Sequence, residues 1–162
     1  MLAGSTVGDG NKFKFPEGIA IDKNNNIYVS DTYNHKIKKI DQQGNVITIA
    51  GSDYGDGINF KYPKALTVDT NGNIFVVDSG NNKIKKISTT GLVSTFSSLN
   101  SSDLTNYIAI EGITIDSSNN LYVTFGSKII KIDPTGNKSD YHTITGNNSF
   151  LSGSFNNNRF SK

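Results

Sequence analysis

Five charged residues that could bind a cation or move a proton recur at one fixed spacing. Glu17, Lys64 and Glu111 follow one another at intervals of 47 residues, and Asp31 and Asp78 are separated by the same interval. Carboxylates can ligate a hard cation such as Ca²⁺ or act as general bases. For Asp31 and Asp78, which each follow an apolar run, exact repetition favours a structural use. We expect both to accept hydrogen bonds from backbone N–H groups of the loop that follows.

Two further segments that begin with Asp have the spacing of ligands found at the start of a calcium-binding loop. Asp22–Asn26 and Asp69–Asn73 both place Asp or Asn at alternate positions. Neither has the glycine and the distal glutamate of an EF-hand at the required spacing. The sequence therefore predicts hairpin turns in both segments.

The residues needed for other kinds of catalysis are few. The chain has no Cys, which excludes thiol catalysis, disulfides and cysteine-held metals. His35 and His142 fall at non-equivalent positions of the repeat and are poor partners for one metal ion. No nucleophile elbow, P-loop or dinucleotide fingerprint is present. We expect no enzymatic activity and no cofactor.

Charge and hydropathy exclude two classes of partner. Sixteen basic and fourteen acidic residues give a formal net charge of +2, which provides no electrostatic footprint for nucleic acid. No apolar run approaches the length of a membrane span, and the first residues lack the features of a signal peptide. We expect a soluble protein. The lysines at positions 38, 39, 85 and 86 are expected on an exposed outer strand with extended, solvated side chains.

Four kinds of short apolar segment repeat along the chain. The first kind covers residues 16–22, 63–69 and 110–116, the second 27–31, 74–78 and 121–125, the third 36–40, 83–87 and 128–132, and the fourth 46–49, 93–96 and 141–144. They are rich in Ile, Val, Tyr, Phe and Thr and are bounded by Asp, Asn and Gly, which is typical of strands. Gly44, Gly91 and Gly136 suit left-handed positions in hairpins. Each unit is therefore predicted to be a four-stranded antiparallel meander.

The repeated residues resemble a known family. The pattern P-x-G-I-x-x-D, N-I-Y-V-x-D, N-H-K-I-K-K-I, G-x-V and A-G is similar to the NHL repeat, whose units form the blades of six-bladed β-propellers. The third copy departs from the pattern at Ile110 and Phe125 and has a shorter loop. The resemblance implies an all-β fold with about three four-stranded antiparallel blades, or half of a six-bladed ring, because the chain holds about 3.4 units of 47 residues.

The expected organisation is a single propeller segment. Blades are predicted at residues 16–51, 63–96 and 110–146, after a strand remnant with an interblade loop at 1–15 and before a trailing loop at 147–162. We expect the series that begins with Ile19, Ile21, Val29 and Ile37, with its equivalents 47 residues apart, to be buried between blades. The uncovered outer faces would be closed by further blades of a longer chain or by a second copy in a homodimer.

The candidate site is the end of the blades that carries the longer loops. Its predicted ligand-binding residues are Glu17, Tyr33, Asn34, His35, Lys64, Asn81, Asn82 and Glu111. We expect a non-enzymatic module that recognises a protein or a carbohydrate there. The resemblance leaves two alternatives open, a single-stranded RNA-binding propeller and a metal-dependent hydrolase or lyase, of which a calcium-dependent lactonase-like enzyme is one form. It also favours an extracellular or cell-surface setting over others.

Overall fold

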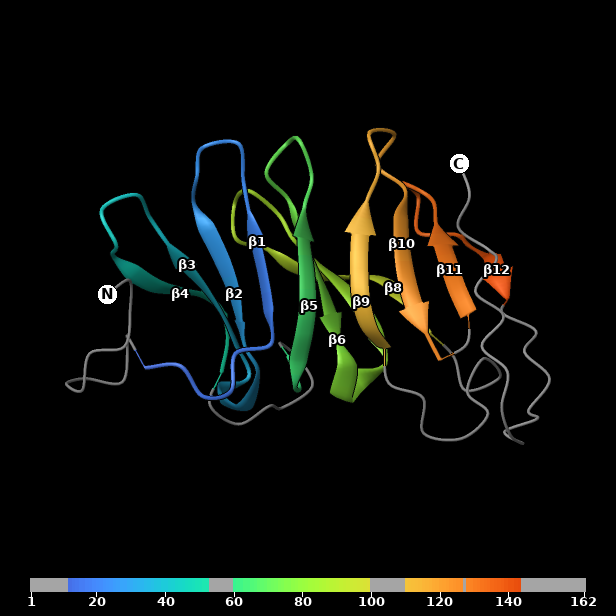
Figure 1. Ribbon diagram of the computed structural model, residues 1–162. Coiled ribbons are helices and arrows are strands. Elements are labelled where there is room, and N and C mark those ends of the chain that lie inside the picture. The colour runs from blue at the N-terminus through green and yellow to red at the C-terminus, as the bar shows by residue number, and fades with distance from the viewer. Residues whose placement is uncertain (1–11, 53–59, 100–109, 127, 144–162) are drawn as a thin grey trace, which may run out of the picture.

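The chain folds into three sheets, each built from four consecutive antiparallel strands (Figure 1). The computed structural model describes residues 12–52, 60–99, 110–126 and 128–143. Blade 1 contains β1 (Gly18–Ile21), β2 (Ile27–Asp31), β3 (Lys36–Ile40) and β4 (Val46–Gly51). Blade 2 contains β5 (Pro63–Val68), β6 (Ile74–Asp78), β7 (Lys83–Ile87) and β8 (Val93–Ser98). Blade 3 contains β9 (Ile110–Ile115), β10 (Leu121–Phe125), β11 (Lys128–Ile132) and β12 (Lys138–Thr143).

The prediction of an all-β fold with three meanders is confirmed. The helical elements of the described residues are two short 3₁₀ turns, η1 (Thr32–Asn34) and η2 (Ser79–Asn81). Within those residues, no helix has both the length and the apolar character needed to cross a membrane.

Aspartates build the tight turns that connect the strands. Asp22 Oδ1 accepts hydrogen bonds from the backbone N–H groups of Asn24 and Asn26, at 2.8 and 2.9 Å. Asn25, between them, has a φ of 59°, in the left-handed region that Asn tolerates. Asp69 makes the same bonds around Gly72, which has a φ of 90°. Both segments are therefore hairpin turns, as predicted.

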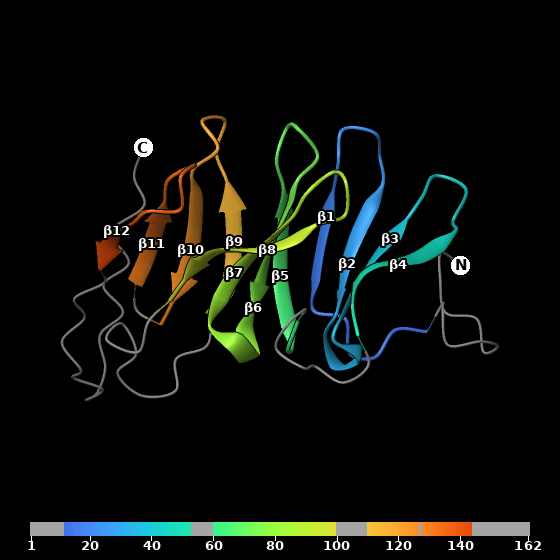
Figure 2. The ribbon, with the colours of Figure 1, turned by 180° about the vertical axis from the view of Figure 1, so that it is seen from behind.

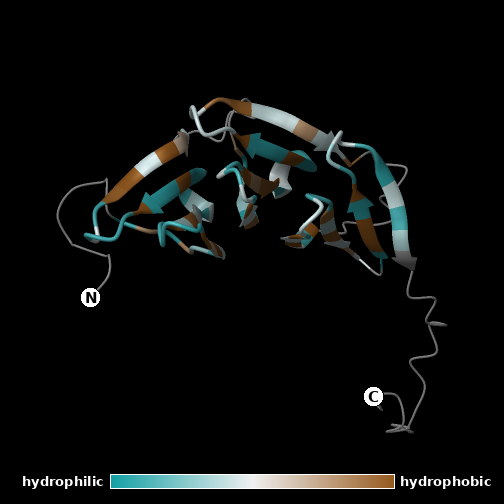
Figure 3. Cartoon of the chain, turned by 90° about the horizontal axis from the view of Figure 1, so that it is seen from above, coloured by the Kyte–Doolittle hydropathy of each residue, from teal (hydrophilic) through white to brown (hydrophobic). Residues whose placement is uncertain are grey.

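The three sheets stand side by side as an open arc. The first strand of each sheet, β1, β5 or β9, is its inner strand, and these inner strands are in contact. β5 lies next to both β1 and β9, and the view from above shows the curvature of the row (Figure 3). The views from the front and from behind place the hairpin turns at one end of the arc and η1 and η2 at the other (Figures 1 and 2). We call these ends the turn face and the loop face.

Apolar side chains fill the spaces between neighbouring sheets. Ile37 of blade 1 belongs to the same buried cluster as Leu66 and Val76 of blade 2. A second cluster joins blade 2 to blade 3 and includes Val77 and Val123. Stacking the sheets in this way buries faces that a single four-stranded sheet would leave in water.

The predicted burial of Ile19 and Ile21 is wrong. Their side chains are 72% and 60% exposed, whereas Leu66, the residue equivalent to Ile19 in blade 2, is 5% exposed. Leu66 packs towards blade 1, but no sheet of the described residues covers the corresponding face of β1. Val29 and Ile37 are buried as predicted.

The prediction that Lys38 and Lys85 are exposed is also wrong. Both are buried, and Lys38 Nζ lies 2.9 Å from Asp31 Oδ2 while Lys85 Nζ lies 3.1 Å from Asp78 Oδ2. Their ammonium groups also lie over the rings of Phe13 and Phe60 in the links before blades 1 and 2. A buried charge requires such partners, and the neighbouring Asp supplies them.

The buried aspartates have the structural role that was predicted, but with different partners. Asp31 Oδ1 accepts the backbone N–H of Lys14 at 2.7 Å, and Asp78 Oδ1 accepts that of Lys61 at 2.7 Å. These donors lie in the link before each blade and not in the loop after the strand. Each aspartate therefore fastens an incoming link to its blade.

Candidate functional site

The loop face is built from the two 3₁₀ turns and from the links that lead into the inner strands. Each 3₁₀ turn ends in a left-handed residue, His35 with a φ of 57° and Asn82 with a φ of 50°. The backbone N–H of Tyr33 donates to the carbonyl oxygen of Lys14 at 3.1 Å, and that of Gly80 donates to Lys61 at 2.8 Å. These bonds hold each link against the 3₁₀ turn of the same blade.

Three of the predicted ligand-binding residues, all of them charged, lie together. Lys64 Nζ lies 3.9 Å from Glu17 Oε2 and 3.9 Å from Glu111 Oε1. The three inner strands place them in a row, with the lysine between the two glutamates. Because the ammonium lies between the carboxylates, the row is a mixed-charge surface with no unshielded carboxylate pair for a hard cation.

Four ring side chains gather beside this row. We define the aromatic cluster as Phe15, Tyr33, His35 and Tyr62. The ring centroids of Phe15 and Tyr33 are 5.0 Å apart, those of Tyr33 and Tyr62 are 5.6 Å apart, and those of His35 and Tyr62 are 4.6 Å apart. The rings meet at angles of 54° to 72°, so the cluster presents tilted faces and edges and no flat platform.

The cluster is exposed, although its members touch one another. Phe15 is 69% exposed, Tyr33 48% and Tyr62 41%. His35 Nδ1 accepts the backbone N–H of Tyr62 at 3.1 Å. In the neutral imidazole the ring proton is then on Nε2, which can donate to a ligand.

Backbone strain is concentrated in this cluster. Phe15 and Tyr62 have φ values of 48° and 49°, and each precedes the proline that leads into an inner strand. Bulky side chains rarely adopt this region, and such strain persists only where the surrounding structure enforces it. The hydrogen bonds of Asp31 and Asp78 to the links provide that enforcement.

The remaining predicted site residues have other positions. The side-chain amides of Asn34 and Asn81 donate to Asp31 Oδ2 and Asp78 Oδ2, at 2.9 and 2.8 Å, so these amides join the 3₁₀ turns to the buried ion pairs. Asn82 is exposed on the loop face of blade 2. Of the eight predicted residues, Tyr33 and His35 lie in the aromatic cluster.

Phe15 and Tyr62 are not among the eight numbered site residues, although aromatic residues of the interblade links were expected to contribute to the loop face. A signal for them was present, because an aromatic residue precedes a proline at two positions 47 residues apart. The residue at the third equivalent position, Ala109, lies outside the described residues.

The described residues contain no group of three or more His, Asp and Glu side chains that could hold a metal ion. His35 lies against the ring of Tyr62 and accepts the backbone N–H of Tyr62 at Nδ1. The side chain of His142 lies outside the described part of the chain. Among the described residues, no set of metal ligands can therefore be assigned to the metal-dependent alternatives.

Comparison with known proteins places the repeats and the fold. The NHL repeat matches residues 13–40 and 60–87. Each matched range contains one buried Asp–Lys ion pair and the phenylalanine over which the lysine lies. No curated protein matches the chain significantly.

Solved structures with the same arrangement of sheets are distant in sequence. Virginiamycin B lyase from Staphylococcus aureus is 19% identical with a TM-score of 0.64, over 80% of this chain and 41% of that protein. A gluconolactonase from Xanthomonas campestris is 11% identical with a TM-score of 0.62, over 82% and 48%. A Bacteroides thetaiotaomicron protein is 16% identical with a TM-score of 0.67, over 93% and 35%.

At these identities the likeness concerns the fold alone. The chain spans less than half the length of each of these three structures. The chain therefore contains two NHL repeats, and its three sheets correspond to part of a β-propeller fold.

Proposed function

We propose that this protein is a non-enzymatic recognition module that binds a protein or a carbohydrate through its loop face. The observation that carries the proposal is the aromatic cluster of Phe15, Tyr33, His35 and Tyr62, which stays exposed on strained backbone. Exposed large aromatic side chains are favoured at binding surfaces because they bury a large area and lose little conformational entropy.

The polar groups beside the cluster suit a neutral ligand. Lys64 is flanked by Glu17 and Glu111, and the ammonium of Lys38 is neutralised by Asp31. A polyanion would meet carboxylates as well as ammonium groups on this surface. The mixed-charge row and the His35 Nε2 can instead donate to and accept from hydroxyl or peptide groups, while the rings contact the C–H face of a sugar or an apolar side chain.

The test begins with a screen of immobilised glycans and peptides against the 162-residue chain, followed by affinity measurements with the best ligand. Tyr33→Ala and Tyr62→Ala are each expected to weaken binding by at least about tenfold, because both remove a ring from the contact surface. Tyr141→Ala is the matched control. Tyr141 is 59% exposed and also contacts a tyrosine ring edge to face, but it lies on β12 of blade 3.

Folding of each variant is checked by its NMR spectrum before binding is measured. Equal affinities for Tyr33→Ala, Tyr62→Ala and the unaltered chain would contradict the proposal. Tight binding of single-stranded oligouridylate that falls steeply with salt, combined with no glycan or peptide ligand, would replace it with the RNA-binding alternative.

A further inference from the structure

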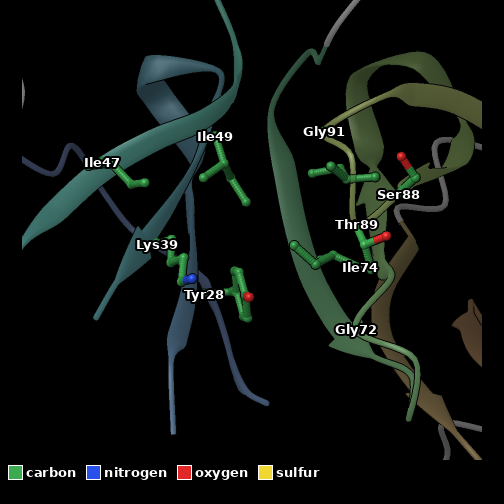
Figure 4. Close-up of a pocket in the computed structure, with 10 residues that line it drawn as sticks. Tyr28, Lys39, Ile47, Ile49, Gly72, Ile74, Ser88, Thr89 and Gly91 are labelled. Carbon is green, nitrogen blue, oxygen red and sulfur yellow. The ribbon is translucent and has the colours of Figure 1, made fainter. Parts of the chain in front are cut away.

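A pocket lies at the opposite end of the molecule from the loop face. It has a volume of about 220 Å³ between blades 1 and 2, and its lining includes the turn residues Gly72 and Gly91 of the turn face. Figure 4 shows Tyr28, Lys39, Ile47 and Ile49 on the wall formed by blade 1, and the turn around Gly91 on the wall formed by blade 2. The rest of the blade 2 wall consists of Gly72, Ile74, Ile87, Ser88 and Thr89.

The pocket exists because blade 1 carries a smaller side chain than its neighbour at one position. In blade 2 the residues equivalent to Tyr28 and Ile49 are Phe75 and Phe96, whose ring centroids lie 4.9 Å apart. Phe75 and Phe96 both pack against the cluster that joins blade 2 to blade 3. Ile49 has no ring to fill the corresponding space between blades 1 and 2.

The walls of the pocket combine apolar side chains with about as much polar surface, and the hydroxyl groups of Tyr28 and Ser88 already have partners. The hydroxyl of Tyr28 donates to Asp22 Oδ2 at 3.0 Å. Ser88 Oγ lies 2.8 Å from Thr90 Oγ1 and accepts the backbone N–H of Leu92 at 3.1 Å. These groups are therefore engaged within their own turns.

Lys39 differs from its two equivalents. Lys86 Nζ lies 5.6 Å from the ring centroid of Phe75, and Lys131 Nζ lies 5.8 Å from that of Tyr122. Among the described residues, no hydrogen bond, ion pair or ring contact holds the ammonium of Lys39. The nearby Asp41 carboxylate already accepts hydrogen bonds from Asn45 and Gln43. Lys39 thus brings to the pocket an ammonium group that makes no direct ion pair among the described residues and whose charge is offset in part by the nearby Asp41 carboxylate.

We propose that this pocket binds a small organic carboxylate with a compact apolar body, such as an aryl or branched alkyl carboxylate. The carboxylate pairs with Lys39, and the apolar body lies among Ile49, Ile74 and Ile87. Pockets for drug-sized ligands span roughly 300 to 1,000 Å³, so this smaller pocket suits a ligand of about ten non-hydrogen atoms. Affinity for so small a ligand is expected on the order of 1 mM.

The experiment is an NMR titration of the 162-residue chain with sodium benzoate, with benzamide as the uncharged probe of the same shape. Benzoate is expected to shift the amide signals of Gly72 and Gly91 and to saturate, with benzamide binding at least about fivefold more weakly. Ile49→Phe copies the ring of Phe96 and should abolish binding. Lys39→Gln should weaken benzoate binding about fivefold and leave benzamide binding unchanged.

Lys86→Gln is the matched control, since Lys86 occupies the equivalent position above Phe75 and should leave benzoate binding unchanged. The two probes keep the test decisive even where a variant folds poorly. Failure of benzoate to saturate at tens of millimolar, equal binding of benzoate and benzamide, or full binding by Ile49→Phe would each overturn the proposal.

Discussion

At the scale of single residues, the buried ion pairs are the feature that most distinguishes blades 1 and 2 from blade 3. Asp31 and Lys38 are both buried and face each other at 2.9 Å. In blade 3 the two equivalent positions carry Phe125 and Ile130, which are also buried. Both charges have thus been replaced together by apolar side chains, as expected for groups that depend on each other.

The dependence of these two charges on each other can be measured by mutation. Lys38→Ile alone leaves the Asp31 carboxylate buried without its cation and should lower the free energy of unfolding by about 3 to 5 kcal/mol. The double variant Asp31→Phe with Lys38→Ile reproduces the pair found in blade 3 and should recover a substantial part of that loss. Urea denaturation provides the values, and Lys39→Ile at the half-buried neighbouring position controls for the loss of a lysine. Additive effects of the two single changes would contradict the account.

The sequence contained a signal for this pair that the strand pattern obscured. Lys38 was expected to be exposed because its strand was predicted to lie near the outer rim of the blade, and that reasoning considers one strand at a time. The simultaneous loss of Asp and Lys from the third copy, at positions 125 and 130, connects two strands. Only a comparison of the copies position by position could have paired them.

The aspartates of the turns make the free energy of unfolding depend on pH in the acid range. The hydroxyl of Thr135 and the backbone N–H of Asn137 donate to Asp133 and lower the pKa of its carboxyl from 3.8 to about 2. The Asp133 carboxyl has a lower pKa in the folded chain than in the unfolded chain. Its hydrogen bonds therefore stabilise the fold fully above about pH 4, and this stabilisation is lost as the pH falls towards 2.

Acid unfolding curves can test this contribution. Between pH 4 and 2, the free energy of unfolding should fall less steeply for Asp133→Asn than for the unaltered chain, because the titrating group has been removed. Asp140→Asn, at an exposed residue that pairs with Lys128, serves as the comparison outside the turns. Parallel curves for Asp133→Asn and the unaltered chain would show that the turn bonds do not favour the charged carboxylate.

At the scale of elements, the strands and turns could be predicted because their signals are local. Alternating apolar residues bounded by Asp, Asn and Gly determine each hairpin without reference to the rest of the chain. The row of Glu17, Lys64 and Glu111 could be predicted for the same reason, since equivalent positions of stacked units lie together. The aromatic cluster combines a link of one blade with the 3₁₀ turn of its neighbour, and such contacts require the packed structure.

The close approach of the inner strands supplies an element-scale prediction. A Cβ added to Gly18 of β1 would collide with the backbone carbonyl oxygen of Lys64 in β5. Gly18→Ala should therefore force the two strands apart and lower the free energy of unfolding by about 1 to 3 kcal/mol.

Gly112→Ala is the matched control for this change, because Gly112 has the equivalent position in β9. Its added Cβ would meet only the side chain of Thr124, with the nearest atom 2.9 Å away, and a side chain can move. Thermal unfolding should show a much smaller loss for Gly112→Ala. Equal losses for the two variants would rule out backbone contact between β1 and β5 as the cause.

At the scale of the whole molecule, the arc has an uncovered apolar face at blade 1. Ile19 and Ile21 are exposed there, beside a pocket of about 320 Å³ that Phe13, Ile19 and Val29 help to line. The equivalent surface of blade 2 is covered by blade 1. The predicted completion of the ring, by further blades or by a second copy, would cover this face in the same way.

The 162-residue chain on its own should therefore associate with itself. Sedimentation velocity over a range of concentrations should show species larger than 17.5 kDa. Ile19→Lys should shift the distribution towards the monomer, whereas Leu92→Lys, at an equally exposed residue of the turn face, should not. A single monomeric species at every concentration would show that the exposed isoleucines do not drive association.

The most direct test of the proposed recognition function is a map of where the ligand binds. Once the screen has supplied a glycan or peptide, chemical-shift changes in the 162-residue chain should concentrate at residues 12–18, 32–36 and 61–65 of the loop face. Amide signals of the turn face, such as those of Asn24, Gly44 and Gly91, should remain in place. Shifts confined to the turn face, with the region around Tyr33 and Tyr62 unchanged, would contradict recognition through the aromatic cluster.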